Sequence, residues 1–239
     1  MISKKMSEYL NSLLDERNSE LWNDLNTTHN ITLEPSFEPN FITNFKDDNI
    51  TIYVYEDNLS PADFTHELLH IRLKSNGLDI GRDLNKKIEE NEKLYCLFST
   101  ALKDHISNCL EHIKMLPIFI DLGFKNSQFL SDYKSKKMSS GQMQEIALRY
   151  RESRIYDREA VDSFIGLFFA MKADNNRMNK YDIQYKKLSK LDKKLYKLLV
   201  DFWEDWLTFD YNDKDDNYDD IINYFIEDLN DWHDNKTVI

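Results

Sequence analysis

The pentapeptide at residues 66–70 combines side chains that can bind a metal ion and move a proton. His66 and His70 stand at positions i and i+4, so on a helix their imidazoles project from the same face, about one turn apart. Imidazoles placed in this way can share one tetrahedral metal ion. Glu67 lies beside them, where its carboxylate can take a proton from water held by the metal. The pattern therefore predicts a metal site with a general base.

The flanking residues predict the helix that this pattern requires. Ser60 can cap the helix, Pro61 suits its first position, and Asp63 suits the end of a capping box. Asn76-Gly77 predicts the end of the helix, because glycine readily adopts the left-handed conformation. A buried helix must satisfy its polar groups, and a metal would do so. The apolar residues that predict burial are Phe64, Leu68, Leu69, Ile71 and Leu73.

Composition limits the class of protein. The chain has 239 residues, of which 41% are hydrophobic, and this is enough for a substantial core. The low counts of 5 Gly and 4 Pro disfavour a turn-rich all-β fold. A net charge of −12 disfavours non-specific binding to nucleic acid or to anionic membranes, so neither is an expected partner. Nothing in the sequence indicates an oligomeric state.

Cysteine usage and the N-terminus predict a cytoplasmic protein. Cys96 and Cys109 form no Cys-x-x-Cys arrangement, so a disulfide framework is not expected. The first residues carry lysines but no apolar run of the kind that signal peptides have. The longest apolar stretch, residues 164–171, is too short to span a bilayer.

Hydrophobic periodicity predicts a mostly α-helical α+β fold with a helical C-terminal half. Runs at residues 41–45 and 50–56, with turn residues 47–49 between them, predict a hairpin. It should form a small antiparallel sheet that packs on helix 61–76. The other predicted helices cover residues 3–25, 82–116 (ended by Pro117), 142–173, 183–209 and 218–232, and the loops cover 26–40, 125–141 and 210–220.

Two domains are expected from this organisation. Residues 1–124 would form a metal-binding domain that includes the N-terminal helix. Residues 142–239 would form a helical extension packed on it. The aromatic residues of the extension, Trp203, Trp206 and Phe209, are expected in the helical core, with an exposed binding patch as the alternative.

A strand followed by the pentapeptide helix and by further helices resembles the zincin fold of metallopeptidases over residues 41–123. Strand 50–56 and the residues His66, Glu67 and His70 carry the resemblance. In zincins the two histidines bind zinc, the glutamate polarises the water, and an edge strand holds the substrate extended. The resemblance thus implies a zinc-dependent peptidase, with Zn²⁺ as cofactor, Glu67 as the catalytic base, and a protein or peptide as substrate.

The third zinc ligand must come from another element. The metzincin extension is absent, because Gly77 stands one position too late and the next histidine is His105. In gluzincin-like enzymes this ligand is a glutamate on a later helix, which here would be Glu111. We favour His112, whereas Glu111 and His105 stay open. The segment also resembles uncharacterised bacterial zincin-like proteins, in a pattern formed here by Asn108, His112, Pro117 and Gly123.

The same residues are compatible with two other interpretations. A catalytically inactive zincin-like metal-binding domain could act as a protein-interaction or regulatory module. The pattern could also be accidental in a helical regulatory protein. Metal content separates the accidental pattern from the other two readings, and turnover separates the peptidase from the inactive module. For a peptidase, the donor that stabilises the oxyanion would come from Tyr150, Tyr156 or His105.

Overall fold

The computed structural model describes residues 4–46, 49–153, 155–213, 216–234 and 236–239. Helices predominate among these residues and the strands form two small sheets, so the predicted mostly α-helical α+β fold is confirmed. The chain divides into two compact units, Met1–Leu78 with Lys114–Tyr133, and Asp79–Ile113 with Lys134–Ile239. These units do not decide the predicted division into domains at 1–124 and 142–239, which stays a prediction.

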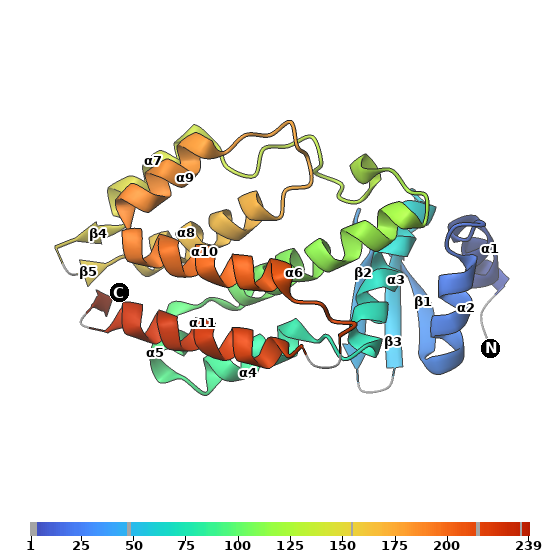
Figure 1. Cartoon of the computed structure of the whole chain (residues 1–239). Helices are drawn as coiled ribbons and strands as arrows, with labels where there is room; N and C mark the ends of the chain where they lie inside the picture. The colour runs from blue at the N-terminus through green and yellow to red at the C-terminus, as the bar shows by residue number, and fades with distance from the viewer. Residues whose placement is uncertain (1–3, 47–48, 154, 214–215, 235) are drawn as a thin grey trace. The chain divides into compact units, whose positions relative to one another are not determined.

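The first unit contains a mixed three-stranded sheet with helices beside it (Figure 1). Strand β3 is central, runs antiparallel to β2 and parallel to β1, and buries alternate residues Ile50, Ile52 and Val54. The predicted hairpin is confirmed as β2 and β3, although turn residues 47–48 lie outside the described residues. The elements are α1 (Lys4–Leu13), α2 (Ser19–Thr28), β1 (Asn30–Ser36), β2 (Ile42–Lys46), β3 (Asn49–Tyr55), α3 (Pro61–Ser75) and η1 (Asn126–Gln128).

Strand β1 corrects the prediction of a loop at residues 26–40. Pro35 made a loop the expectation, because proline cannot donate to a sheet ladder. β1 is an edge strand that pairs only with β3 within the sheet, and an edge position tolerates proline. The added strand makes the sheet mixed, whereas the sequence predicted an antiparallel one.

Asn18 explains why the predicted helix 3–25 is two helices. Its side chain is fully buried; Oδ1 accepts a hydrogen bond from Asp15 N at 2.9 Å. Its Nδ2 donates to Leu13 O at 2.9 Å and to Thr65 Oγ1 at 3.0 Å. These bonds satisfy the backbone at the end of α1 and attach the interruption to α3.

Helix α3 begins and ends where the sequence predicts. Ser60 caps it by accepting a hydrogen bond from Asp63 N at 3.3 Å, and Pro61 occupies the first turn. Gly77 follows the helix with φ +87°, a conformation that favours glycine. Phe64 is fully buried and packs against Trp22 of α2, with ring centroids 5.5 Å apart. This packing holds α3 in place within the first unit.

The second unit is helical, with one small sheet formed by β4, β5 and β6. Figure 1 shows α10 and α11 side by side, and their aromatic side chains fill the core. Trp203, Trp206 and Phe209 are all buried, so the prediction of core packing is confirmed. The elements are α4 (Ile80–Glu89), α5 (Glu92–Leu97), α6 (Thr100–Asp121, which continues into the first unit), α7 (Ser140–Arg149), β4 (Arg151–Glu152), β5 (Ile155–Tyr156), α8 (Arg158–Lys172), α9 (Asp182–Leu191), α10 (Lys193–Thr208), α11 (Tyr218–His233) and β6 (Thr237–Val238).

Several predicted helices are divided differently in the structure. The region 82–116 is α4, α5 and most of α6, and α6 continues through Pro117. Proline removes one helical hydrogen bond, but the buried residues Met115 and Phe119 on either side favour continuing the helix. The strands β4 and β5 interrupt 142–173, and Asp192 divides 183–209 by capping α10 through Leu195 N. The helix predicted at 218–232 is confirmed as α11.

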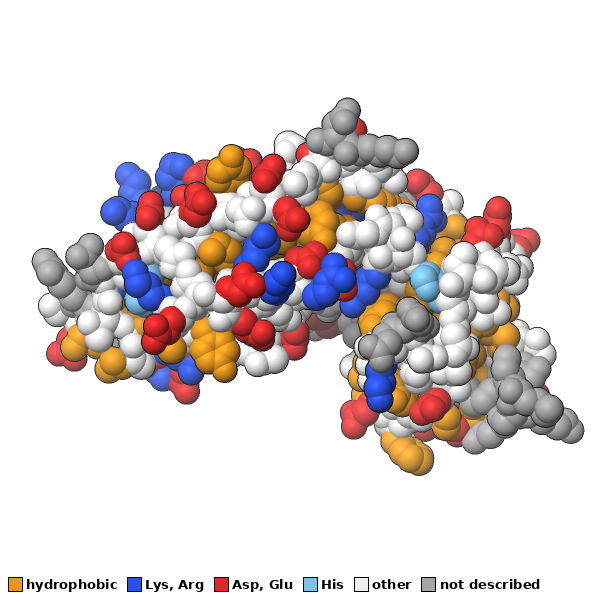
Figure 2. Space-filling model, turned by 90° about the horizontal axis from the view of Figure 1, so that it is seen from below, with side chains coloured by type: hydrophobic (Ala, Val, Ile, Leu, Met, Phe, Trp, Pro, Cys, Tyr) orange, Lys and Arg blue, Asp and Glu red, His pale blue; other side chains and the backbone are white. Residues whose placement is uncertain are grey.

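The face of the molecule seen in Figure 2 is charged with both signs. Figure 2 shows lysine and arginine side chains lying among aspartate and glutamate side chains, with hydrophobic side chains in small groups. Within the described ranges, every helix is either too short or too polar to cross a bilayer.

Candidate metal centre

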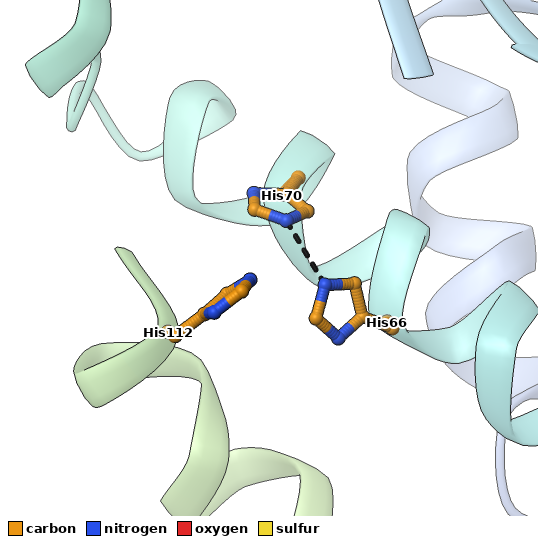
Figure 3. Close-up of side chains that lie close together, drawn as sticks. All are labelled: His66, His70 and His112. Atoms are coloured by element: carbon orange, nitrogen blue, oxygen red, sulfur yellow. Dashed lines mark hydrogen bonds between the residues drawn. The ribbon is translucent and has the colours of Figure 1, made fainter. Parts of the chain in front are cut away.

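Helix α3 brings the two histidines of the pentapeptide together. The Nε2 atoms of His66 and His70 lie 3.2 Å apart, and their ring centroids lie 4.9 Å apart. The i, i+4 spacing places both rings on one face of the helix, as the sequence predicts. Figure 3 shows these two nitrogens facing each other.

His112 of α6 completes a group of three histidines. It lies two residues before Lys114, where the same continuous helix enters the first unit. Its ligand nitrogen and those of His66 and His70 all lie within 4.8 Å of one another. Figure 3 shows its ring directed toward the other two. Among the described residues, these three histidines form a group whose ligand atoms lie close enough together to hold a metal ion.

The geometry of these nitrogens fits a tetrahedral metal ion. Zinc–nitrogen bonds of 2.0–2.1 Å give tetrahedral edges of about 3.3 Å. The 3.2 Å separation of His66 and His70 matches that edge. The ligand nitrogen of His112 lies within 4.8 Å of the other two, compared with this edge of about 3.3 Å. Three imidazoles with an open fourth position are a known ligand set for catalytic zinc.

The surroundings of His66 favour its neutral, metal-binding form. Burial lowers the pKa of His66 well below 6.5, and the neighbouring His70 lowers it further. A hydrogen bond with the backbone of Phe129 opposes this shift. The Phe129 ring, which is 3% exposed, lies against the His66 ring with centroids 4.8 Å apart. Phe129 thus helps to set the orientation of the His66 ring.

Glu67 is held by the neighbouring strand of the sheet. It is 8% exposed, and its Oε2 accepts a hydrogen bond from Thr43 Oγ1 of β2 at 2.7 Å. Burial raises the pKa of Glu67, whereas His70 and the bonds to Thr43 lower it. A carboxylate with a raised pKa is suited to accept and return a proton near neutral pH.

The other predicted site residues do not belong to this group. His105 is exposed, and its Nε2 lies 3.1 Å from Gly166 O of α8. Glu111 is buried but is not part of the three-histidine group. Tyr150 is fully buried and donates its hydroxyl to Asp192 at 3.1 Å, and the hydroxyl of Tyr156 accepts from Arg151 at 3.3 Å. Both tyrosines already have structural roles, so neither is favoured as an oxyanion donor.

Two residues that contact the pentapeptide, Thr43 and Phe129, were not predicted from the sequence. Thr43 belongs to the predicted hairpin, but a single threonine in a strand carries no signal for contact with Glu67. Phe129 follows η1 in a segment predicted as a loop. An apolar residue in a polar loop was the available sign that this segment packs against something.

Comparisons with known proteins leave the family open: no protein-family model, no curated protein and no solved structure matches this chain.

Proposed function

We propose that this chain is a zinc-dependent peptidase of the zincin-like kind. The observation that carries the proposal is the convergence of His66, His70 and His112, with ligand nitrogens within 4.8 Å of one another and Glu67 beside them. Three histidine ligands that come from elements distant in the sequence suit a metal ion that keeps its fourth coordination position open. The proposed cofactor is Zn²⁺ and the proposed substrate is a protein or peptide.

The proposed roles follow from the position of each side chain. His66, His70 and His112 would hold the metal through their ring nitrogens. When bound, zinc would supply a Lewis acid that lowers the pKa of water and polarises a carbonyl. Glu67 would accept the proton of the attacking water at its carboxylate and return it to the leaving amine. Thr43 would hold that carboxylate in place between the two transfers.

A metal-binding module without turnover is the second candidate function. The observation that favours it is the environment of Glu67, which is 8% exposed and already accepts a hydrogen bond from Thr43. A carboxylate satisfied by the protein could serve to support the histidines instead of reacting. In that case the chain would act as a protein-interaction or regulatory domain.

Metal content and turnover test the proposal together. Metal analysis of the purified protein should give one equivalent of zinc, which a chelator removes. Glu67→Gln keeps shape and polarity but removes the base, so it should retain zinc and lower hydrolysis by on the order of 10²–10⁴-fold. New protein N-termini would be compared in cells that express the wild type or the variant.

The outcomes separate the candidates. Termini that appear with the wild type and disappear with Glu67→Gln support the peptidase. Identical termini in the presence of a full zinc equivalent favour the metal-binding module. A wild-type protein without zinc, even after incubation with the metal, would make the histidine group incidental.

A further inference from the structure

The lysines of the second unit are concentrated where α9 meets α10. Asp192 is both the C-cap of α9 and the N-cap of α10, so the ends of these helices meet at this residue. At 1.5 Å per residue, the lysines on both sides lie within about 9 Å of Asp192 along the helix axes. All are exposed, and we call the group the basic corner: Lys186, Lys187, Lys190, Lys193 and Lys194.

Further positive charge lies beside the basic corner. Burial lowers the pKa of Lys236, and the positive charges of Lys194 and Arg151 lower it as well, whereas the carboxylates of Asp192 and Asp234 raise it. Lys236 also lies over the ring of Trp232, with Nζ 4.6 Å from the centroid. Lys236, in the segment after α11, therefore lies within electrostatic range of Lys194 of the basic corner and of Arg151 of strand β4.

The positive charge of the basic corner is not neutralised locally. Among the residues that the structure describes, its lysines form no ion pair, in contrast to Lys197, which pairs with Asp201. The carboxylate of Asp192 is directed inward: it is 8% exposed and accepts hydrogen bonds from Tyr150, Trp232 and Leu195. Thus the acidic residue nearest to these lysines in the sequence is occupied within the core.

Helix stability explains only part of the arrangement, because Lys190 lies in the last turn of α9, where the helix dipole favours positive side chains. Lys193 and Lys194 occupy the first turn of α10, where the helix dipole disfavours positive side chains. Their exposure also means that they contribute little to the core. A role for the charge itself accounts better for lysines at these positions.

We propose that the basic corner binds the phosphate backbone of nucleic acid, a function beyond the peptidase proposed above. The net charge of −12 led to the expectation of no such partner. However, charges separated by more than a Debye length of about 8–10 Å are largely screened at physiological ionic strength. A phosphate at the corner therefore responds mainly to the lysines within that distance, and clustered lysines are the usual footprint of backbone binding.

The surface suits nucleic acid better than a lipid membrane. Amphipathic helices bind membranes by burying an exposed apolar face beside their lysines. In the basic corner, Leu188 is fully buried in the protein and Leu191 is half-buried. The strongly exposed apolar residue of α9, Ile183, lies near the opposite end of the helix from Asp192.

The test compares two variants of the same net charge. A fluorescein-labelled 20-base-pair DNA duplex would be titrated with the full chain, and anisotropy measured from 50 to 200 mM NaCl. The corner variant carries Lys187→Gln, Lys190→Gln, Lys193→Gln and Lys194→Gln. The control variant carries the same change at exposed lysines elsewhere: Lys46, Lys86, Lys134 and Lys136. Circular dichroism would verify that both fold.

Contact of the corner lysines with five phosphates predicts a slope of log K against log salt of about −4.5, and a loss of affinity of about 500-fold over this range. The corner variant should have a slope near −1 and at least about tenfold weaker binding at 50 mM, whereas the control should stay close to the wild type. Equal losses in both variants, or no binding of DNA by the wild type at 50 mM, would overturn the proposal. So would binding to phosphatidylserine vesicles without binding to DNA.

Discussion

The hydroxyl of Thr43 donates a hydrogen bond to the carboxylate of Glu67 across 2.7 Å, and so joins an edge strand of the sheet to helix α3. Both partners are positioned by packing, because β2 lies against α3 in the first unit. The bond restrains the side chain proposed as the general base. It also lowers the pKa of Glu67 against the effect of burial.

Removal of the Thr43 hydroxyl should slow turnover and leave zinc binding unchanged. Thr43→Val keeps the shape of the side chain and deletes the bond, whose strength for a charged acceptor is about 1.5–3 kcal/mol. We expect about 10–100-fold slower turnover, unchanged zinc content, and an acid limb of the pH–rate profile displaced to higher pH, because the pKa of Glu67 rises further. Thr43→Ser should restore all three. An unchanged pH profile would contradict a positioning role.

The third ligand can be identified by comparing neighbours on α6. Changes to residues that only support a metal ligand typically weaken metal binding by about 10–100-fold. If His112 is itself a ligand, His112→Ala should weaken zinc binding by more than this. Glu111→Gln and His105→Ala should leave the affinity near that of the wild type, since neither residue belongs to the histidine group. Competition with a chromophoric chelator measures the affinity. A larger loss in Glu111→Gln would assign the ligand to the glutamate, as in gluzincin-like enzymes.

The metal-free protein should lose stability in weak acid through His66. Because burial holds the folded-state pKa of His66 well below 6.5, the unfolded chain takes up this proton first. The stabilisation is therefore complete above about pH 6.5 and declines as the pH falls below it. Between about pH 7.5 and 5.5, the chelated wild type should lose about 1 kcal/mol more unfolding free energy than chelated His66→Gln. Urea unfolding at the two pH values measures this difference, and equal losses would mean that His66 does not titrate as proposed.

Asn18 should be a strong determinant of stability in the first unit. Asn18→Ala removes the partners of Leu13 O, Asp15 N and Thr65 Oγ1, so buried polar groups lose their hydrogen bonds. We expect a loss of about 2–3 kcal/mol in the free energy of unfolding. Asn11→Ala, at an exposed position of α1, is the matched control and should change stability by less than about 0.5 kcal/mol. Similar losses in both variants would contradict the role of Asn18.

Local interactions explain what the sequence by itself determined. The cap at Ser60, the proline after it and the glycine at position 77 each act within a few residues, and α3 begins and ends accordingly. The i, i+4 spacing of His66 and His70 likewise carries its own geometry once a helix forms. Alternating β-branched residues placed β3 for the same reason.

Only the tertiary structure decided which distant residues meet these histidines. His112 was favoured over Glu111 and His105 in the sequence, but helical spacing alone could not show that its ligand nitrogen lies near those of His66 and His70. Thr43 and Phe129 carry no local signal, because their contacts depend on how β2 and the segment after α6 pack against α3. The breaks at Asn18 and Asp192 also depend on partners far along the chain, Thr65 for one and Tyr150 and Trp232 for the other. Side-chain periodicity reports which face of an element is buried, whereas the identity of the residues that cover it is set by long-range packing.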